Sequence, residues 1–284
     1  SAAKYAIIRE MFGVHNLSYA NAFLQIFSLI GIIASSWLAI VGVNLIDLQA
    51  LVRYEAVGVI ISKSVVIPWI LVTVSVLGTV ASFLIPKVKY NDKNIKFSVA
   101  RRRLSFGWRH RTLRASIIAL SMFWALAQVF LLVFQDVSGS QTVNTMQNYL
   151  AFAVVGLVVG SIIAAHNSKD FIETGFVPLG MIGASLCMFL IPFFVHPVAL
   201  SILYTAIGIF GGMFLVPVNA LLQYNTRPNN SGWVIALANM IQALVLVVFL
   251  FIYSSLVRYT SLEPSYYFIG LALISVGVFY WSIL

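Results

Sequence analysis

The stretch GGMFLVPVNALLQYN, residues 211–225, combines a membrane-type apolar run with residues that disturb or decorate a helix. Two glycines open it, Pro217 interrupts the apolar run, and Asn219 and Gln223 follow one helical turn apart. Residues four apart share a helix face, so both amides are expected on the same side. Pro217 removes one backbone hydrogen bond and predicts a bend, which either turns these amides away from lipid or only shapes the packing of the helix. The stretch therefore predicts a membrane-spanning helix with a polar end.

The composition of the whole chain is that of a polytopic membrane protein. Of its 284 residues, 61% are hydrophobic and 9% are charged, whereas a soluble domain carries about 25% charged residues. The single cysteine, Cys187, excludes a disulfide framework. The sequence contains no GxxxxGK[ST], HExxH, CxxC or GxSxG motif. We therefore expect no enzymatic activity, no catalytic residue, no metal site and no cofactor.

Eight apolar stretches are each close to the roughly 20 residues that a helix needs to cross a bilayer. They are residues 20–43, 65–86, 113–135, 148–166, 175–195, 197–222, 233–257 and 264–284. Backbone groups in lipid must be paired internally, so these stretches predict α-helices. The dipeptide His196–Pro197 separates the fifth from the sixth and predicts a tight helical hairpin. The fold class is an all-α membrane protein, and the start at Ser1 predicts a fragment of a longer chain.

The distribution of lysine and arginine predicts the orientation in the membrane. With a cytoplasmic N-terminus, 14 basic residues fall on the cytoplasmic side and 3 on the other. The 14 are Lys4, Arg9, ten residues within 87–114, Lys169 and Arg227, and the three are Arg53, Lys63 and Arg258. Both termini of the chain are therefore expected to be cytoplasmic.

Two segments between the spans allow more than one interpretation. Residues 87–114 are either an ordinary positively charged cytoplasmic linker or a polybasic patch on anionic lipid; a nucleic-acid partner is not expected. The external segment 44–64 is either a surface helix or an extension of the two flanking spans. Domain boundaries follow as 1–86 for the remainder of an N-terminal half, 87–112 for the linker, and 113–284 for a C-terminal half.

Small residues recur at a spacing of four within two spans. Gly156 and Gly160 form one GxxxG pattern, and Gly208 and Gly212 form another. This spacing lets helix backbones approach closely in lipid. Tight static packing and sliding of one helix along another are both compatible with it.

The polar residues within the spans are amides rather than charges. Three pairs lie near the predicted cytoplasmic ends, and Gln128 stands alone one turn after Trp124. The pairs are Asn21 with Gln25, Asn219 with Gln223, and Asn239 with Gln242. Each pair is either a hydrogen-bonding contact between packed helices, worth about 0.6–2 kcal/mol, or part of an uncharged inner vestibule.

Four stretches together resemble the lysophospholipid transporters, a bacterial branch of the major facilitator superfamily. SAAKYAIIRE (1–10) resembles the motif after that family's fourth span, and SMFW (121–124) resembles the start of its seventh. GSIIAAHNSKDFIETGFVPLG (160–180) is similar to its loop between spans eight and nine, and GGMFLVPVNALLQ (211–223) to the end of its tenth span. The resemblance implies a twelve-span bundle of two six-helix halves, of which this chain holds spans five to twelve.

The resemblance also implies a function and a location. Such a protein flips lysophospholipids across the bacterial inner membrane by alternating access, so that an acyltransferase can re-acylate them. The expected partners are the lysophospholipid, membrane lipids, and a fused or adjacent acyltransferase and acyl-carrier synthetase. Two alternatives stay open: a facilitator that carries another amphiphile or a drug, and a non-transporting membrane domain attached to a lipid acyltransferase.

Site residues are assigned by position within this resemblance. The substrate-binding residues are expected to be Lys4, Gln128, Asn219 and Asn239. The gate residues are expected to be Asn21, Gln25, Pro217, Gln223 and Gln242. The chain departs from some relatives by being neutral at Gln25 and Gln242, where they have glutamate, and at Leu131, where they have arginine.

Overall fold

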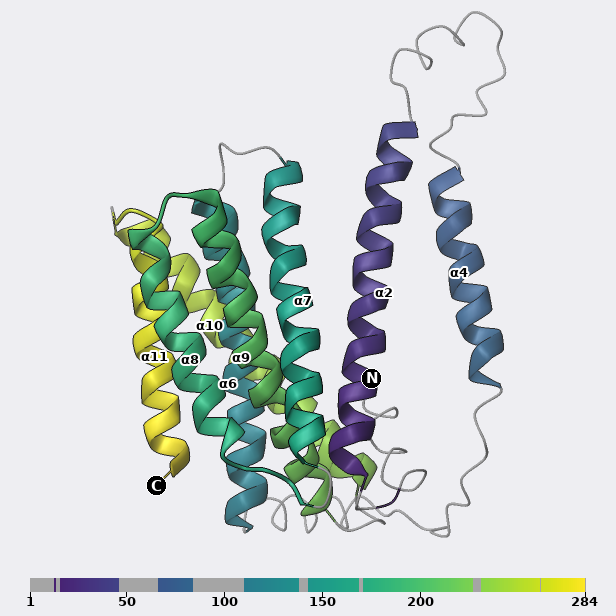
Figure 1. The fold of residues 1–284 in the computed structure, drawn as a ribbon, viewed down its shortest axis with the longest axis vertical. Helices are drawn as coiled ribbons and strands as arrows, with labels where there is room; N and C mark the ends of the chain where they lie inside the picture. The colour runs from purple at the N-terminus through teal and green to yellow at the C-terminus, as the bar shows by residue number, and fades with distance from the viewer. Residues whose placement is uncertain are drawn as a thin grey trace, which may run out of the picture. The chain divides into compact units, whose positions relative to one another are not determined.

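The computed structural model describes residues 13, 16–45, 66–83, 110–137, 143–168, 171–226, 231–260 and 262–283. Within these residues the chain forms eight α-helices and one short 3₁₀ helix, and no strand. The α-helices are α2 (Leu17–Leu45), α4 (Val66–Ser82), α6 (Arg111–Val137), α7 (Val143–Asn167), α8 (Phe176–Leu190), α9 (Pro197–Tyr224), α10 (Ser231–Tyr259) and α11 (Tyr266–Ile283), shown in Figure 1. They coincide with the eight predicted spans to within a few residues at each end. The prediction of an all-α membrane fold is confirmed.

Several of these helices have the length and apolarity of membrane spans. In the described part of the chain, five qualify over at least 18 residues, and they are Arg111–Val137, Asn148–Asn167, Phe176–Phe193, Pro197–Tyr224 and Gly232–Tyr259. Shorter apolar helical stretches cover Leu17–Ile32, Val72–Ala81 and Tyr266–Gly277. Such lengths match the roughly 30 Å hydrocarbon thickness of a bilayer at 1.5 Å per helical residue.

The chain divides into two compact units. The larger contains Ser1–Leu29 and Lys93–Leu284, and the smaller contains Ile30–Asp92. The smaller unit therefore holds the latter part of α2 together with α4. Most of segment 44–64, predicted to be external, and most of the basic segment 87–114 lie outside the described residues. The interpretations given for both segments stay predictions.

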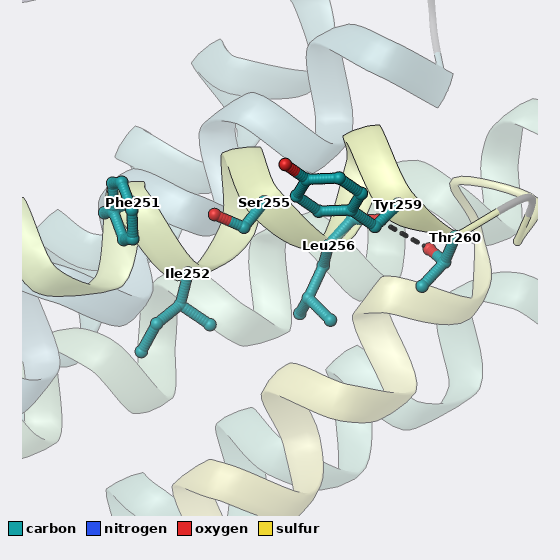
Figure 2. A pocket seen from close by; sticks show the side chains of 6 residues that line it. All are labelled: Phe251, Ile252, Ser255, Leu256, Tyr259 and Thr260. Carbon is teal, nitrogen blue, oxygen red and sulfur yellow. Dashed lines mark hydrogen bonds between the residues drawn. The ribbon is translucent and has the colours of Figure 1, made fainter.

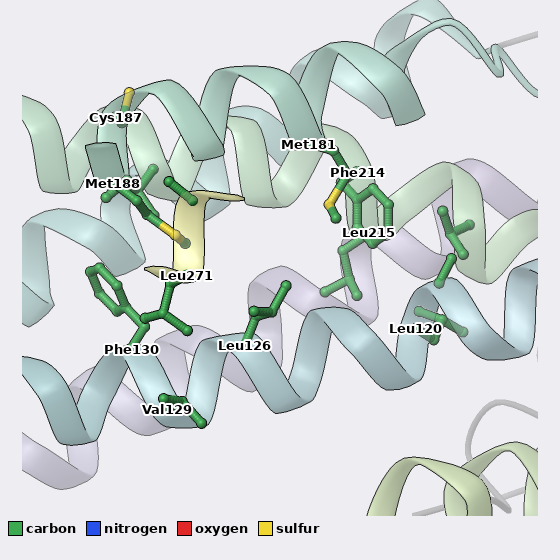
Figure 3. Close-up of a cluster of buried hydrophobic side chains, with 14 of the residues drawn as sticks. Leu120, Leu126, Val129, Phe130, Met181, Cys187, Met188, Phe214, Leu215 and Leu271 are labelled. Atoms are coloured by element: carbon green, nitrogen blue, oxygen red, sulfur yellow. The ribbon is translucent and has the colours of Figure 1, made fainter. Parts of the chain in front are cut away.

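The core of the larger unit forms around α9. This helix packs against α7, α8 and α6, while α6 also packs against α10 and α11, and α11 packs against α8. Figure 3 shows the buried side chains that α6, α8, α9 and α11 contribute to this core. Among them, the ring of Tyr204 contacts those of Phe130, Phe134 and Tyr149 at centroid distances of 5.7, 5.1 and 5.5 Å. Interlocking apolar and aromatic side chains thus hold these helices together.

The hairpin between α8 and α9 forms as the sequence predicts. A 3₁₀ helix at Ile191–Phe193 ends α8, and α9 begins directly at Pro197. The backbone N–H of Val198 donates to Nδ1 of His196 at 3.3 Å, so this histidine caps the new helix. Proline fits the first turn of a helix because its missing N–H is not needed there.

The two GxxxG patterns face each other where α7 packs against α9. A Cβ atom added at Gly156 or Gly160 would collide with the backbone carbonyl of Thr205 or Ile209 on α9. A Cβ atom at Gly208 or Gly212 would collide in turn with the backbone of α7. The four glycines therefore allow direct backbone contact between α7 and α9, which is the close packing that the spacing predicts.

Candidate functional site

The structure brings two of the predicted gate residues together as a reciprocal pair of amides. Asn21 lies near the start of α2, and Gln223 lies near the end of α9. Asn21 Nδ2 donates to Gln223 Oε1 at 3.1 Å, and Gln223 Nε2 donates to Asn21 Oδ1 at 2.7 Å. Their side chains are only 3% and 1% exposed. Each amide thus satisfies the other in a place that water does not reach.

A second hydrogen bond fixes the orientation of the Asn21 side chain. Its Nδ2 also donates to the Leu17 carbonyl oxygen one turn earlier, at 2.8 Å. An amide nitrogen has two N–H groups, so Asn21 uses both, one within its own helix and one across to α9. The side chain is therefore anchored to α2 before it reaches Gln223, which lowers the entropy lost when the pair forms.

Small side chains on either side of the amide pair let α2 approach α9 and α7. One buried cluster joins Leu17 and Ala20 of α2 to Ala220 of α9. A second cluster joins Ala22 of α2 to residues of α7 and α9, which are Ala164, Ala165 and Val216. Alanine carries no side-chain entropy to lose and holds the partner helix at short range. The interface is thus built from small apolar contacts with one polar pair at its centre.

The α9 segment that presents Gln223 runs without interruption through Pro217. The helix extends from Pro197 to Tyr224, and Pro217 is buried within it. Since proline has no N–H, the Met213 carbonyl loses its usual helical partner. Two residues further on, Asn219 Nδ2 donates to the Leu215 carbonyl at 3.0 Å. The Asn219 amide therefore bonds within α9 rather than across to another helix.

The loop between α7 and α8 packs against the same end of α2. Ile172 lies against the cluster of Leu17, Ala20 and Ala220. The loop is held by its own polar contacts: the Glu173 N–H donates to Ser168 Oγ at 3.3 Å, and the Gly175 N–H donates to Glu173 Oε1 at 3.1 Å. Ile172 thus joins the loop to the apolar contact between α2 and α9.

Most of the other predicted site residues occupy separate positions on α2, α6 and α10. Gln25 is buried one turn beyond Asn21, with 7% of its surface exposed. Gln242 is half-buried on α10, whereas Asn239 on α10 and Gln128 on α6 are exposed. Lys4 lies outside the described residues. The role of each of these residues stays a prediction.

The sequence did not predict one polar network, which involves Tyr253 and Asp136. Tyr253 of α10 donates a short hydrogen bond from its hydroxyl to Asp136 Oδ2, near the end of α6. The Tyr253 ring packs edge-on against that of Tyr267 on α11, 5.5 Å away, and the Tyr267 hydroxyl lies 2.8 Å from Thr260 Oγ1. These contacts join the ends of α6, α10 and α11. In the sequence, the aspartate at the very end of an apolar span is the feature that could have indicated this network.

A groove of about 280 Å³ lies along the end of α10, but it does not have the features of a binding site (Figure 2). Phe251, Ile252, Ser255, Leu256, Tyr259 and Thr260 line it. They are neighbours on one stretch of chain, and the Thr260 hydroxyl is already engaged with the Leu256 carbonyl at 2.6 Å. A ligand site usually needs polar groups that converge from several elements.

The two amides can form and break their hydrogen bonds without any charged group being buried or exposed. Among the described residues, no three histidine, cysteine, aspartate or glutamate side chains are grouped so that they could hold a metal ion. When the pair separates, each amide can bond to water or to a polar ligand instead of to the other amide. The free-energy cost is small because the hydrogen bonds are satisfied both in the pair and after separation. A buried carboxylate would carry a much larger desolvation cost. The pair is thus suited to an interface that opens and closes.

Comparison with known proteins places the chain in a family. Residues 1–250 match the Major Facilitator Superfamily. The chain is 25% identical to the lysophospholipid transporter LplT of Photorhabdus laumondii over 100% of its own length and 67% of that protein. It is 27% identical to LplT of Escherichia fergusonii, with 89% of the chain and 62% of the relative aligned. It is 26% identical to LplT of Escherichia coli K12, with 98% of the chain and 66% of the relative aligned.

The chain thus spans about two thirds of the length of these curated relatives. No solved structure matches it at a significant level. The match to the superfamily covers most of the chain, and the helices provide the apolar spans that such a protein requires. The chain therefore belongs to the Major Facilitator Superfamily and resembles its lysophospholipid transporters.

Proposed function

We propose that this chain is the larger part of a transporter that flips lysophospholipids across the bacterial inner membrane by alternating access. The similarity to three lysophospholipid transporters over 89–100% of the chain is the observation that carries the proposal. The uncharged span interiors are compatible with an amphiphilic cargo whose acyl chain favours an apolar surface. Re-acylation by a fused or adjacent acyltransferase and acyl-carrier synthetase would then use the lipid delivered to the cytoplasmic leaflet.

In this proposal the contact between Asn21 and Gln223 is the inner gate. By the predicted topology, the start of α2 and the end of α9 lie at the cytoplasmic side. The reciprocal amide pair and the alanine contacts would hold the two helices together while the outer side is open. Each interhelical hydrogen bond between amides is modest, about 1 kcal/mol, so closure would stay reversible. Gln25, Pro217 and Gln242 are proposed to support this gate from neighbouring positions.

The proposed substrate contacts are distributed over several helices. Gln128 and Asn239 are exposed on α6 and α10, and Asn219 is partly exposed on α9. Exposed amides within apolar spans indicate a polar cavity or a partner helix, because lipid offers them no hydrogen bond. Lys4 would meet a lipid phosphate at the cytoplasmic mouth, where an ammonium group is a suitable point charge.

Uptake of labelled lysophosphatidylethanolamine tests this function. Cells that express the full-length protein should accumulate the label faster than cells with an empty vector, and most of the label should lie in the cytoplasmic leaflet. An equal rate in both strains would contradict the proposal. Accumulation of an unrelated amphiphile instead would favour the alternative of a general facilitator, which the neutral Leu131 position supports.

A further inference from the structure

Ser18, the second residue of α2, has a buried hydroxyl group without a hydrogen bond. Its side chain is 2% exposed, and its oxygen is itself enclosed. Within the described part of the chain, two other buried side-chain atoms share this condition, Ser185 Oγ on α8 and Trp233 Nε1 on α10. A buried hydroxyl that makes no hydrogen bond destabilises the state in which it is buried. The start of α2 therefore carries an unfavourable group three residues before the amide pair.

The position of Ser18 in the first turn of α2 explains why its hydroxyl is unpaired. Hydroxyl groups within helices commonly donate to the carbonyl oxygen four residues earlier. Those of Ser116, Ser121 and Ser161 do so at 2.9, 2.7 and 2.7 Å. Because α2 begins at Leu17, no carbonyl of this helix lies four residues before Ser18. The hydroxyl therefore lacks the partner that a helix gives to hydroxyls further along.

The face of α2 that carries Ser18 is turned toward α7 and α9. Asn21 and Ala22 lie three and four residues further on and are therefore neighbours of Ser18 on this face. Asn21 bonds to Gln223 of α9, and Ala22 packs in the buried cluster with α7 and α9. Separation of α2 from these helices would uncover Ser18 together with the amides. By the predicted topology this end of α2 is cytoplasmic, so the uncovered hydroxyl would bond to water.

We infer that Ser18 biases the proposed inner gate toward its open state, because its hydroxyl is unsatisfied when the gate is closed and hydrated when the gate is open. This inference rests on the proposed transport function through the gate, and it does not depend on which lipid is carried. The amide pair and the alanine contacts hold α2 against α9, whereas the Ser18 hydroxyl favours separation. These opposed contributions keep the closed state from becoming too stable to open in each transport cycle.

The reactivity of a cysteine inside the interface measures how often the gate opens. Ala220 of α9 is 0% exposed and packs against α2, so a thiol at this position should react with a maleimide when α2 moves away. Ala220→Cys is introduced into a full-length protein in which Cys187 and any other cysteine are replaced by alanine, and its labelling rate is followed in lipid nanodiscs. Ser18→Ala removes the unsatisfied hydroxyl. Ser185→Ala is the matched control, because it removes another unsatisfied hydroxyl, 3% exposed, from a helix that packs against α9 and α11.

Ser18→Ala is expected to slow labelling at position 220 by roughly three- to tenfold, whereas Ser185→Ala should leave the rate unchanged. An unchanged or faster rate in Ser18→Ala would overturn the inference, as would equal slowing by both variants. A lower unfolding midpoint in Ser18→Ala would do so too, because the hydroxyl would then be stabilising. Uptake of labelled lysophosphatidylethanolamine by the native protein is measured in parallel. Absence of uptake would overturn the proposed function, while the labelling rates would still decide the effect of Ser18.

Discussion

At the scale of single residues, the amide pair is the feature on which the account depends. Asn21 and Gln223 are 202 positions apart in sequence and satisfy each other beside two buried apolar clusters. Loss of one partner would take two hydrogen bonds from the other buried amide, and an unsatisfied buried polar atom costs about 1–3 kcal/mol. Loss of both partners removes these unsatisfied atoms. The two positions should therefore be strongly coupled.

A double-mutant cycle measures this coupling. Asn21→Ala and Gln223→Ala are each expected to lower the stability of the purified full-length protein, while the double variant should lose less than the sum of the two. The coupling should be about 0.6–2 kcal/mol. Thermal unfolding in detergent provides the measurement. Asn219→Ala is the matched control, because that amide bonds within α9 and should combine additively with Asn21→Ala. Additive losses for Asn21 and Gln223 would show that the pair does not form.

At the scale of helices, α7 and α9 are joined by contact between their backbones. The four glycines at Gly156, Gly160, Gly208 and Gly212 leave no room for a Cβ atom. We expect α7 and α9 to move together because of this contact, so that opening of the proposed gate separates α2 from both; sliding of α7 along α9 is the alternative. The alanine contacts flanking Asn21 are the ones that such a movement would break.

Glycine substitutions test the close packing of α7 against α9. Gly160→Ala and Gly208→Ala should each destabilise the protein by about 1–3 kcal/mol or prevent its folding, because the added methyl group meets backbone atoms. Gly270→Ala on α11 is the matched control, since nothing lies within 4 Å of its added Cβ atom. That variant should be neutral or slightly more stable, because alanine favours helices. Unfolding midpoints and monodispersity after solubilisation provide the readout, and equal behaviour of all three variants would contradict the close packing.

Much of this arrangement could be predicted from the sequence, because a backbone that crosses lipid must pair its own N–H and C=O groups and therefore forms helices. The length of each apolar run therefore identified the helices, and His196 with Pro197 located the hairpin. The GxxxG spacing indicated close packing but did not identify the helix against which each pattern packs. Likewise, the spacing of Asn219 and Gln223 placed both amides on one face, whereas only the fold shows that Gln223 reaches Asn21. The Asp136–Tyr253 contact joins two helices far apart in sequence, so no local pattern could reveal it.

At the scale of the whole molecule, orientation is the first property to establish. The amide pair is expected at the cytoplasmic side because 14 of the 17 lysine and arginine residues fall on that side of the predicted topology. Single cysteines at positions 103 and 138 test it, introduced into a full-length protein in which Cys187 and any cysteine outside these 284 residues are replaced by alanine. In intact cells a membrane-impermeant thiol reagent should label Ser138→Cys and leave Arg103→Cys unlabelled until the membrane is permeabilised. The opposite pattern would reverse the orientation and move the proposed gate to the outside.

Locking the interface between α2 and α9 tests whether this interface opens during transport. Ala20 and Ala220 belong to one buried cluster beside the amide pair, so cysteines at both positions of the Cys187→Ala full-length protein can be joined by an oxidant or a short cross-linker. The measurement is uptake of labelled lysophosphatidylethanolamine before cross-linking, after it, and after reduction. The account predicts that cross-linking abolishes uptake and that reduction restores it, while Ala20→Cys alone is unaffected. Full uptake by completely cross-linked protein would show that this interface does not open during transport.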